Sequence, residues 1–582
     1  MKRDYYQEKT NLFLENLIVT NKKSQTISLI RFIVFVLFAG CALLGIYDKK
    51  VMFLIPTFLF LGVFIYLVIW HSKIEWQQKL EKSSLKICED YLKRFDYQWQ
   101  DFSNVGGQFV NDALFICRDL DIIGKNSLYQ YLVLAKSNKG QQKLFNSLTS
   151  FEISNDASSI HELASNKDLH LKLSSLINMY DNKKSDLILN DNKSLDLKTK
   201  KVYYFLANIY SIFVLGVLAL ALFNVISLSY LIAILILNAI IVLVKFNSNK
   251  NYLASIHKNH NNLDIVLKVI KEIEQADFES IKLKNIKDTL TRDFNASNSI
   301  NKLIKLKERL ESQSNALLYF FAEVLLLWDY RNVLYYDTWK KTLGKNAQQY
   351  LEIFYDFEVM LSLAIIEQTK EEVVDANVKV SNYPYLNATG LYHPLLNNEN
   401  VIANDFNTQA QTTIITGSNM SGKTTFIRSI GINMLLAYSG AMVCAKKFDV
   451  TLMKIFTSIR VEDNMNDGIS TFYAEINRIK EMVQAQEEGQ VMLCLIDEIF
   501  KGTNSEDRIY GAKETIKHLT KPYCINFVTT HDAQLCEIKN IVNYHFEEFY
   551  ENDEIMFNYV IKKGVSKTRN AKYLLKMAGI VK

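Results

Sequence analysis

Eight consecutive residues carry the strongest chemical pattern in the chain: Gly417, Ser418, Asn419, Met420, Ser421, Gly422, Lys423 and Thr424. They match GxxxxGK[ST] in full, a pattern whose glycines let backbone N–H groups wrap a phosphate at the N-terminus of a helix. Lys423 would reach the β- and γ-phosphates as a catalytic cation, and the Thr424 hydroxyl would hold Mg²⁺. We therefore predict that this octet, extended by Thr425, binds a nucleoside triphosphate together with Mg²⁺.

The segments around the octet have the composition that such a loop requires. Residues 412–416 are rich in β-branched side chains and predict a strand, whereas residues 425–438 predict a helix. A chance match to the pattern is the alternative, but a chance match seldom falls between a strand and a helix. The context therefore favours the phosphate-binding interpretation.

Two further strands are expected to deliver charged groups to the same place. Residues 491–496 are apolar and end in Asp497 and Glu498. Asp497 would bind Mg²⁺ through water, and Glu498 would orient or deprotonate the attacking water. Residues 524–530 predict another strand, which ends at His531. A single histidine at a strand end is more often structural, but strand ends of an open α/β sheet meet at one edge, so we expect Glu498, His531 and Lys423 to act together in catalysis.

These motifs resemble those of the MutS mismatch-repair ATPases of the ABC class. Residues 416–428 are similar to the family's phosphate loop, with Ser418 in place of the usual proline. Residues 497–505 are similar to its DEIGRGTST segment, with departures at Phe500, Lys501 and Asn504. Weaker likenesses lie at residues 393–394, 404–405, 529–531 and 571–580, the last resembling the family's closing helix.

The resemblance also extends to the signature segment of the family. Residues 470–472 with Glu475 are similar to its STF-x-x-E sequence, which contacts the nucleotide of the partner subunit. It implies that Ser470 is a nucleotide-binding residue, that the substrate is ATP with Mg²⁺, and that two copies of the chain pair through their ATPase domains.

Upstream of these motifs, the composition indicates long helices. No proline occurs between Pro56 and Pro384, and Gly216 is the only glycine between Gly140 and Gly344. The net charge of +5 is too small to indicate a nucleic-acid or membrane-surface partner. The seven cysteines include no CxxC pair, which argues against a disulfide framework or a zinc site and fits a reducing compartment.

Four apolar runs, residues 27–47, 51–70, 202–223 and 228–244, form two pairs. Each run is near the ~20 residues that cross a bilayer, and lysines flank both pairs. Positive flanks predict two hairpins in the cell membrane with both ends and the core and ATPase domains in the cytoplasm. The alternative is a set of buried helices in a soluble protein. Residues 316–328 form a shorter apolar run, which predicts a buried helix.

Between the hairpins and the ATPase motifs, residues 121–130 resemble the start of the MutS helical core. Tyr350, Phe354, Phe357, Leu361 and Ala364 share one helical face, which predicts a lever helix. We therefore predict an α plus α/β chain with these parts: an N-terminal cytoplasmic segment (1–26), a transmembrane hairpin (27–71), a first part of the core (72–201), a second hairpin (202–246), a core and lever (247–380), and an ABC-type ATPase domain (381–582).

The motifs together predict a membrane-anchored ATPase that couples hydrolysis at a dimer interface to movement of a helical lever. Mismatch recognition is not expected, because hairpins stand where the family carries its mismatch-reading and connector domains. Two alternatives remain open. One is a DNA-processing protein held at the membrane, and the other is an ABC-type transporter or membrane-remodelling ATPase with no DNA role.

Overall fold

The computed structural model describes residues 2–48, 52, 54–110, 115–181, 195–222, 225–257, 262–292, 295–311, 316–342, 346–397, 399, 401–418, 420–460, 471–501, 504–551 and 554–565. The chain divides into two compact units. Unit 1 contains Met1–Leu134, Gln141–Leu171 and Val359–Lys582, and unit 2 contains Ala135–Gly140 and Lys172–Glu358. A mainly helical chain with two sheets in its C-terminal part confirms the predicted mixture of helical and α/β structure.

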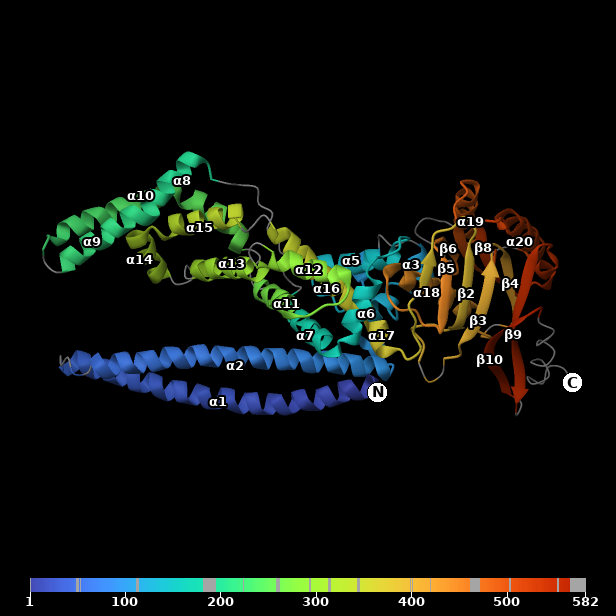
Figure 1. Ribbon diagram of the computed structural model, residues 1–582, viewed down its shortest axis with the longest axis horizontal. Coiled ribbons are helices and arrows are strands. Elements are labelled where there is room, and N and C mark those ends of the chain that lie inside the picture. The colour runs from blue at the N-terminus through green and yellow to red at the C-terminus, as the bar shows by residue number, and fades with distance from the viewer. Residues whose placement is uncertain are drawn as a thin grey trace. The chain divides into compact units, whose positions relative to one another are not determined.

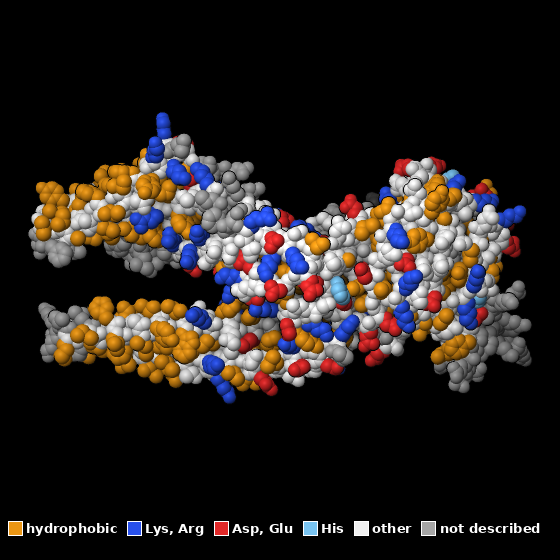
Figure 2. Space-filling view, in the orientation of Figure 1, with side chains coloured by type: hydrophobic (Ala, Val, Ile, Leu, Met, Phe, Trp, Pro, Cys, Tyr) orange, Lys and Arg blue, Asp and Glu red, His pale blue; other side chains and the backbone are white. Residues whose placement is uncertain are grey.

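Unit 1 begins with two long helices, α1 (Lys2–Asp48) and α2 (Leu54–Phe95), which lie side by side as a hairpin (Figure 1). Their seam is polar in the half nearest the N-terminus, where Thr20 Oγ1 donates to Glu81 Oε2 at 2.8 Å. Towards the turn, the outward side chains become apolar, and Phe32 and Phe58 are 65% and 68% exposed. Figure 2 shows this continuous hydrophobic surface over the turn-proximal half of the hairpin.

Among the described residues, three helices are long and apolar enough to cross a membrane, namely Lys2–Gly45, Ile55–Phe95 and Lys198–Ala221. A fourth span would come from Ser229–Val244 and Asn247–Leu253, which are bent by 49° relative to each other. These helices overlap the four apolar runs of the sequence. The insertion of these helices into a membrane stays a prediction.

The N-terminus of α1 packs against the segment that leads into the sheets of unit 1. Tyr6 is fully buried and stacks on Tyr91 of α2, with ring centroids 4.1 Å apart. The Tyr6 hydroxyl donates to Gln368 in α17 (Ile365–Thr369), and Lys2 Nζ donates to the carbonyl of Glu367 at 2.7 Å. These contacts connect the start of the hairpin to the residues just before the first strand.

The helical segments between α2 and the end of α7 are shorter than the hairpin helices. They are η2 (Trp99–Asp101), η3 (Gly107–Phe109), α3 (Phe115–Asp119), α4 (Leu128–Leu132) and α6 (Ala157–Ser165), with α5 (Asn138–Thr149) and α7 (Lys167–Asn178) shared between the units. Ser127 caps α4 by accepting the backbone N–H of Gln130 at 3.2 Å.

A six-stranded sheet in unit 1 has the order β10-β9-β4-β8-β7-β6. Its strands are β4 (Thr412–Thr416), β6 (Lys454–Ser458), β7 (Met492–Asp497), β8 (Cys524–Thr530), β9 (Ile541–Glu551) and β10 (Glu554–Lys563). All neighbouring pairs are parallel except β9 and β10. Every residue of β4 and β8 is buried, as expected for central strands between helices.

Helices α18 (Lys423–Ser439), α19 (Thr471–Glu487) and α20 (Ser505–Leu519) accompany this sheet (Figure 1). A second sheet has the order β1-β5-β2-β3 and consists of β1 (Asn377–Lys379), β2 (Tyr385–Leu391), β3 (Asn404–Gln409) and β5 (Lys447–Thr451). The short helix η7 (Ala533–Glu537) follows β8. In the six-stranded sheet, the register pairs Thr416 with Thr530 and Asp497 with Thr529, so β4, β7 and β8 end at the same level.

Unit 2 is helical. It contains α8 (Leu197–Tyr204), the π-helical segment η4 (Phe205–Tyr210), α9 (Ser211–Leu222), α10 (Leu228–His257), α11 (Leu263–Gln275), α12 (Ile281–Thr291), α13 (Ala296–Glu311), α14 (Ala316–Leu326) and α15 (Trp328–Thr342). The helix α16 (Ala347–Leu363) continues into unit 1. The five residues of the predicted lever face are all buried, but only four of them lie in α16, because Ala364 follows its last residue, Leu363. The role of this helix as a lever stays a prediction.

The predicted helix at residues 316–328 ends earlier than expected. The backbone turns at Leu327, which has φ of 49°, and a new helix starts at Trp328. Glu323 explains the turn, because its carboxylate accepts the backbone N–H of Asp329 at 2.9 Å, in the first turn of α15. An apolar run shows where a helix can be buried, but a side-chain cap of this kind decides where it stops.

Candidate nucleotide-binding site

The phosphate loop joins β4 to α18, as the sequence predicts. Gly417 and Gly422 have φ of 148° and 104°, a region that L-residues with a Cβ rarely adopt. A Cβ on Gly417 would lie 2.9 Å from the carbonyl oxygen of Phe546, so the neighbouring strand also requires glycine there. Asn419 lies outside the described residues. The remaining seven residues of the octet form a tight turn at the N-terminus of a 17-residue helix.

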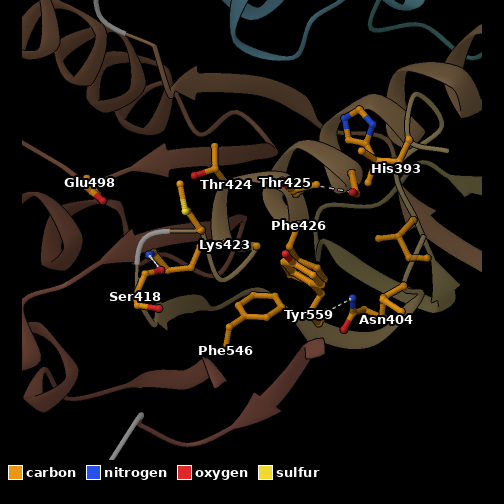
Figure 3. Close-up of a pocket in the computed structure, with 16 residues that line it drawn as sticks. His393, Asn404, Ser418, Lys423, Thr424, Thr425, Phe426, Glu498, Phe546 and Tyr559 are labelled. Carbon is orange, nitrogen blue, oxygen red and sulfur yellow. Dashed lines mark hydrogen bonds between the residues drawn. The ribbon is translucent and has the colours of Figure 1, made fainter. Parts of the chain in front are cut away.

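Lys423 points back into this loop. Its Nζ donates to the carbonyl oxygens of Gly417 and Ser418 at 2.9 and 2.8 Å, and the Ser421 hydroxyl also donates to Ser418 at 2.8 Å. Burial lowers the pKa of Lys423, while Glu498 and Asp497 act in the opposite direction. The ammonium group therefore lies where phosphate oxygens could replace carbonyl oxygens as its acceptors (Figure 3).

The two residues predicted to hold Mg²⁺ touch each other. Thr424 Oγ1 donates to Asp497 Oδ2 at 2.9 Å, and the Thr529 hydroxyl donates to the other Asp497 oxygen. Among the residues that the structure describes, no group of three or more His, Cys, Asp and Glu side chains could hold a metal. A hydroxyl with one carboxylate nevertheless fits Mg²⁺, which keeps several waters and takes its other ligands from substrate phosphates.

Glu498 follows β7 and lies between the side chains of His531 and Lys501. His531 Nε2 lies 2.8 Å from Oε1, and Lys501 Nζ lies 3.0 Å from Oε2. The hydrogen bond from His531, reinforced by Lys501 against the opposing effect of burial, lowers the pKa of Glu498 to about 2. The carboxylate is therefore ionised at neutral pH. The structure brings Lys423, Asp497, Glu498 and His531 to one edge of the sheet, as the strand register requires.

Backbone strain gathers around this site. Four non-glycine residues there have positive φ: Met420 (73°), Glu498 (49°), Phe500 (61°) and Tyr559 (53°). Such conformations cost about 1–3 kcal/mol each and cluster at functional sites. No pattern in the sequence indicates this strain, because none of these residues is a glycine.

A cavity of about 530 Å³ adjoins the loop, and part of its wall is apolar, including Leu391, Leu396 and Ile402. Figure 3 shows Glu498, Lys423 and Ser418 towards one end and His393 and Asn404 towards the other. Polar phosphate-loop residues together with a partly apolar wall suit a triphosphate attached to a flat aromatic base.

Tyr559 lies against the phosphate loop. A Cβ on Gly422 would be 3.2 Å from its ring. Asn404 holds the backbone here, because its Nδ2 donates to the Tyr559 carbonyl at 3.0 Å and its Oδ1 accepts the Ile561 N–H at 2.8 Å. The irregular pairing of β9 and β10 between Phe557 and Ile561 provides this geometry. Sequence reasoning missed Tyr559, and only the likeness at residues 404–405 pointed to Asn404.

Two further sequence features can be placed. Ser418, the departure from proline, donates a hydrogen bond to Glu548 of β9, which is buried. Burial lowers the pKa of His393 to about 3, and the neutral ring accepts the Leu395 N–H at 3.3 Å, which indicates a structural role. Ser470 and the segment 571–580 lie outside the described residues, so their predicted roles stay predictions.

Comparison with known proteins gives a consistent assignment. Residues 413–582 match the family model "MutS domain V". The DNA mismatch repair protein MutS of Prochlorococcus marinus (strain MIT 9312) is 27% identical over 355 residues, which cover 58% of this chain and 36% of that protein. The MutS of Clostridioides difficile (strain 630) is 28% identical over 344 residues, covering 53% and 36%.

MutS protein homolog 4 of Mus musculus is 29% identical over 212 residues, or 34% of this chain and 21% of that protein. The chain spans only about a third of the length of the two bacterial MutS proteins named above. The domain V match coincides with the phosphate loop, the Asp497–Glu498 pair and His531. By this domain, and by relatives that match about half of its length, the chain is a MutS-family protein.

Proposed function

We propose that this chain is a membrane-anchored ATPase that hydrolyses ATP with Mg²⁺ at a site shared by two copies. The observation that carries the ATPase assignment is the meeting of Thr424, Asp497 and Glu498 at the ends of adjacent elements. Mg²⁺ bound by Thr424 and Asp497 would neutralise charge on the phosphate oxygens.

Each side chain has a defined part in the proposed reaction. Lys423 would exchange two backbone carbonyls for oxygens of the β- and γ-phosphates. Glu498, ionised and held by His531 and Lys501, would accept a hydrogen bond from the attacking water and orient it. Tyr559, beside Gly422, and the apolar part of the cavity wall would hold the base.

Membrane anchoring is supported by the surface of the hairpin α1–α2. Beyond Arg31, which lies 3.3 Å from the ring of His71, the outward side chains on both helices are mostly large and apolar. Soluble monomers rarely expose apolar patches larger than a few hundred Å². We therefore infer that the turn-side part of the hairpin, which follows Arg31 in α1 and precedes His71 in α2, lies in lipid. The protein should remain with the membrane pellet after a high-salt, high-pH wash, and its release would reject the anchor.

We propose action on DNA because the names of the relatives describe DNA mismatch repair, and pairing of two copies because residues 470–472 resemble the signature segment of the family. The deciding experiment measures phosphate release by the detergent-solubilised chain alone and with linear, mismatched or branched DNA. Stimulation by DNA would support a DNA-directed role. If the rate depends on Mg²⁺ but none of the DNA substrates alters it, the alternative of a transport or remodelling ATPase is favoured. The absence of any phosphate release would reject the ATPase proposal.

A further inference from the structure

Asp119, at the end of α3, is fully buried and far from the phosphate loop in sequence. Its two carboxylate oxygens accept the backbone N–H groups of Ile459 and Arg460, each at 3.0 Å. The guanidinium of Arg478, only 8% exposed, lies 2.9 Å from Oδ2 and also donates to the carbonyl of Arg460 at 2.9 Å. A buried charge with this many partners holds its surroundings in one arrangement.

The partners of Asp119 belong to elements of the ATPase site. Ile459 and Arg460 follow β6, and Arg478 lies in α19. The nearby Asp121 pairs with Arg460. It also pairs with Arg428 of the phosphate-loop helix α18, whose Nη1 lies 3.4 Å from Asp121 Oδ2. One short segment, residues 119–121, is thus joined to three elements of the site.

Helix α19 also contacts the loop that follows β7 and contains Glu498, Phe500 and Lys501. The Glu475 side chain is buried one turn before Arg478, and burial raises the pKa of its carboxylate, while the backbone of Phe500 and Lys501 acts in the opposite direction. The ring of Phe472 packs edge-to-face on Phe500, with centroids 5.7 Å apart. Lys501 in turn lies 3.0 Å from the Glu498 carboxylate. Asp119 is therefore linked to Glu498 through Arg478, helix α19, the contact of Phe472 with Phe500, and Lys501.

We propose that Asp119 and Arg478 are positioning residues for hydrolysis, which hold α19 so that Phe472 fixes the loop carrying Phe500 and Lys501 and hence the orientation of Glu498. This proposal rests on the ATPase function proposed above. The phosphate loop keeps its own contacts through Lys423 and Ser421, so the proposal predicts a change in the hydrolysis step with little change in nucleotide binding.

The test compares Asp119→Asn with Asp96→Asn in the full chain in detergent. Asn has the shape of Asp but leaves Arg478 without a counter-charge, whereas Asp96 pairs with Arg3 at the surface and serves as the matched control. We expect kcat for ATP to fall by about three- to thirtyfold in Asp119→Asn, with the Kd of a fluorescent ATP analogue within about twofold of wild type. The Asp96→Asn control should match wild type.

Three more variants keep the result interpretable. Phe472→Leu should lower kcat with the same unchanged Kd, even if Asp119→Asn does not fold, and Arg478→Lys should retain more activity than Arg478→Met. Wild-type kcat in both Asp119→Asn and Phe472→Leu would overturn the inference, as would equal losses in kcat and binding. An inactive wild-type protein would reject the proposed function and this inference with it.

Discussion

The Nε2 atom of His531 lies 2.8 Å from the Glu498 carboxylate, so a residue that follows β8 holds the residue that follows β7. Lys501 contacts the second oxygen of the same carboxylate at 3.0 Å. These two contacts keep Glu498 charged and oriented before any substrate enters, which is the preorganisation that hydrolysis requires.

Replacing Glu498 by Gln should therefore stop hydrolysis and leave binding intact. The amide keeps the shape of the side chain but cannot orient water as an anion, and we expect kcat to fall by about 10²–10⁴. Single-turnover assays and size-exclusion chromatography with ATP should show a nucleotide-loaded protein enriched in dimers. Normal turnover in this variant would place the base elsewhere.

Lys423→Ala should abolish tight ATP binding. Two charge-assisted hydrogen bonds to phosphate would be lost, which corresponds to affinity weaker by about 100-fold or more. Isothermal titration with ATP measures this directly. Lys454→Ala, which removes an exposed lysine of β6, is the control and should bind like wild type. An unchanged ATPase rate in Lys423→Ala would contradict the assigned site.

Tyr559→Ala should weaken ATP binding by about tenfold, because base stacking on an aromatic ring contributes about 1–3 kcal/mol. Tyr559→Phe retains the ring and should restore affinity. Inorganic tripolyphosphate contains no base, so competition binding should give it the same affinity for all three proteins. A similar loss for tripolyphosphate in Tyr559→Ala would instead indicate a distorted phosphate loop.

The low pKa of Glu498, about 2 against an ordinary 4.5, has a consequence for stability at acid pH. A depressed folded-state pKa means that the ionised carboxylate stabilises the fold above pH 4.5 and that this stabilisation disappears as the pH falls towards 2. Between pH 5 and 3, Tm should therefore fall more steeply in wild type than in Glu498→Gln. Lys501→Met removes one of the two partners and should lie between them. If Tm fell in parallel for all three proteins over this pH range, the low pKa of Glu498 would be contradicted.

Consecutive residues determined much of the site. Gly417, Gly422 and Lys423 define the phosphate loop because a tight turn before a helix depends on neighbouring backbone geometry, and the apolar run before Asp497 defines a buried strand. The meeting of three strand ends also followed from the pattern, because parallel strands share one edge. The resemblance then identified the family, which the domain V match bears out.

Only the tertiary structure decided which distant side chains complete the site. Tyr559 reaches the loop through an irregular strand pairing held by Asn404, and Ser418 finds Glu548 on β9. Asp119 joins α19 to β6 across more than 300 residues of sequence. Short-range sequence patterns determine the local backbone conformation. These contacts instead depend on how separate helices and strands pack against one another, which the spacing of residues in the sequence does not indicate.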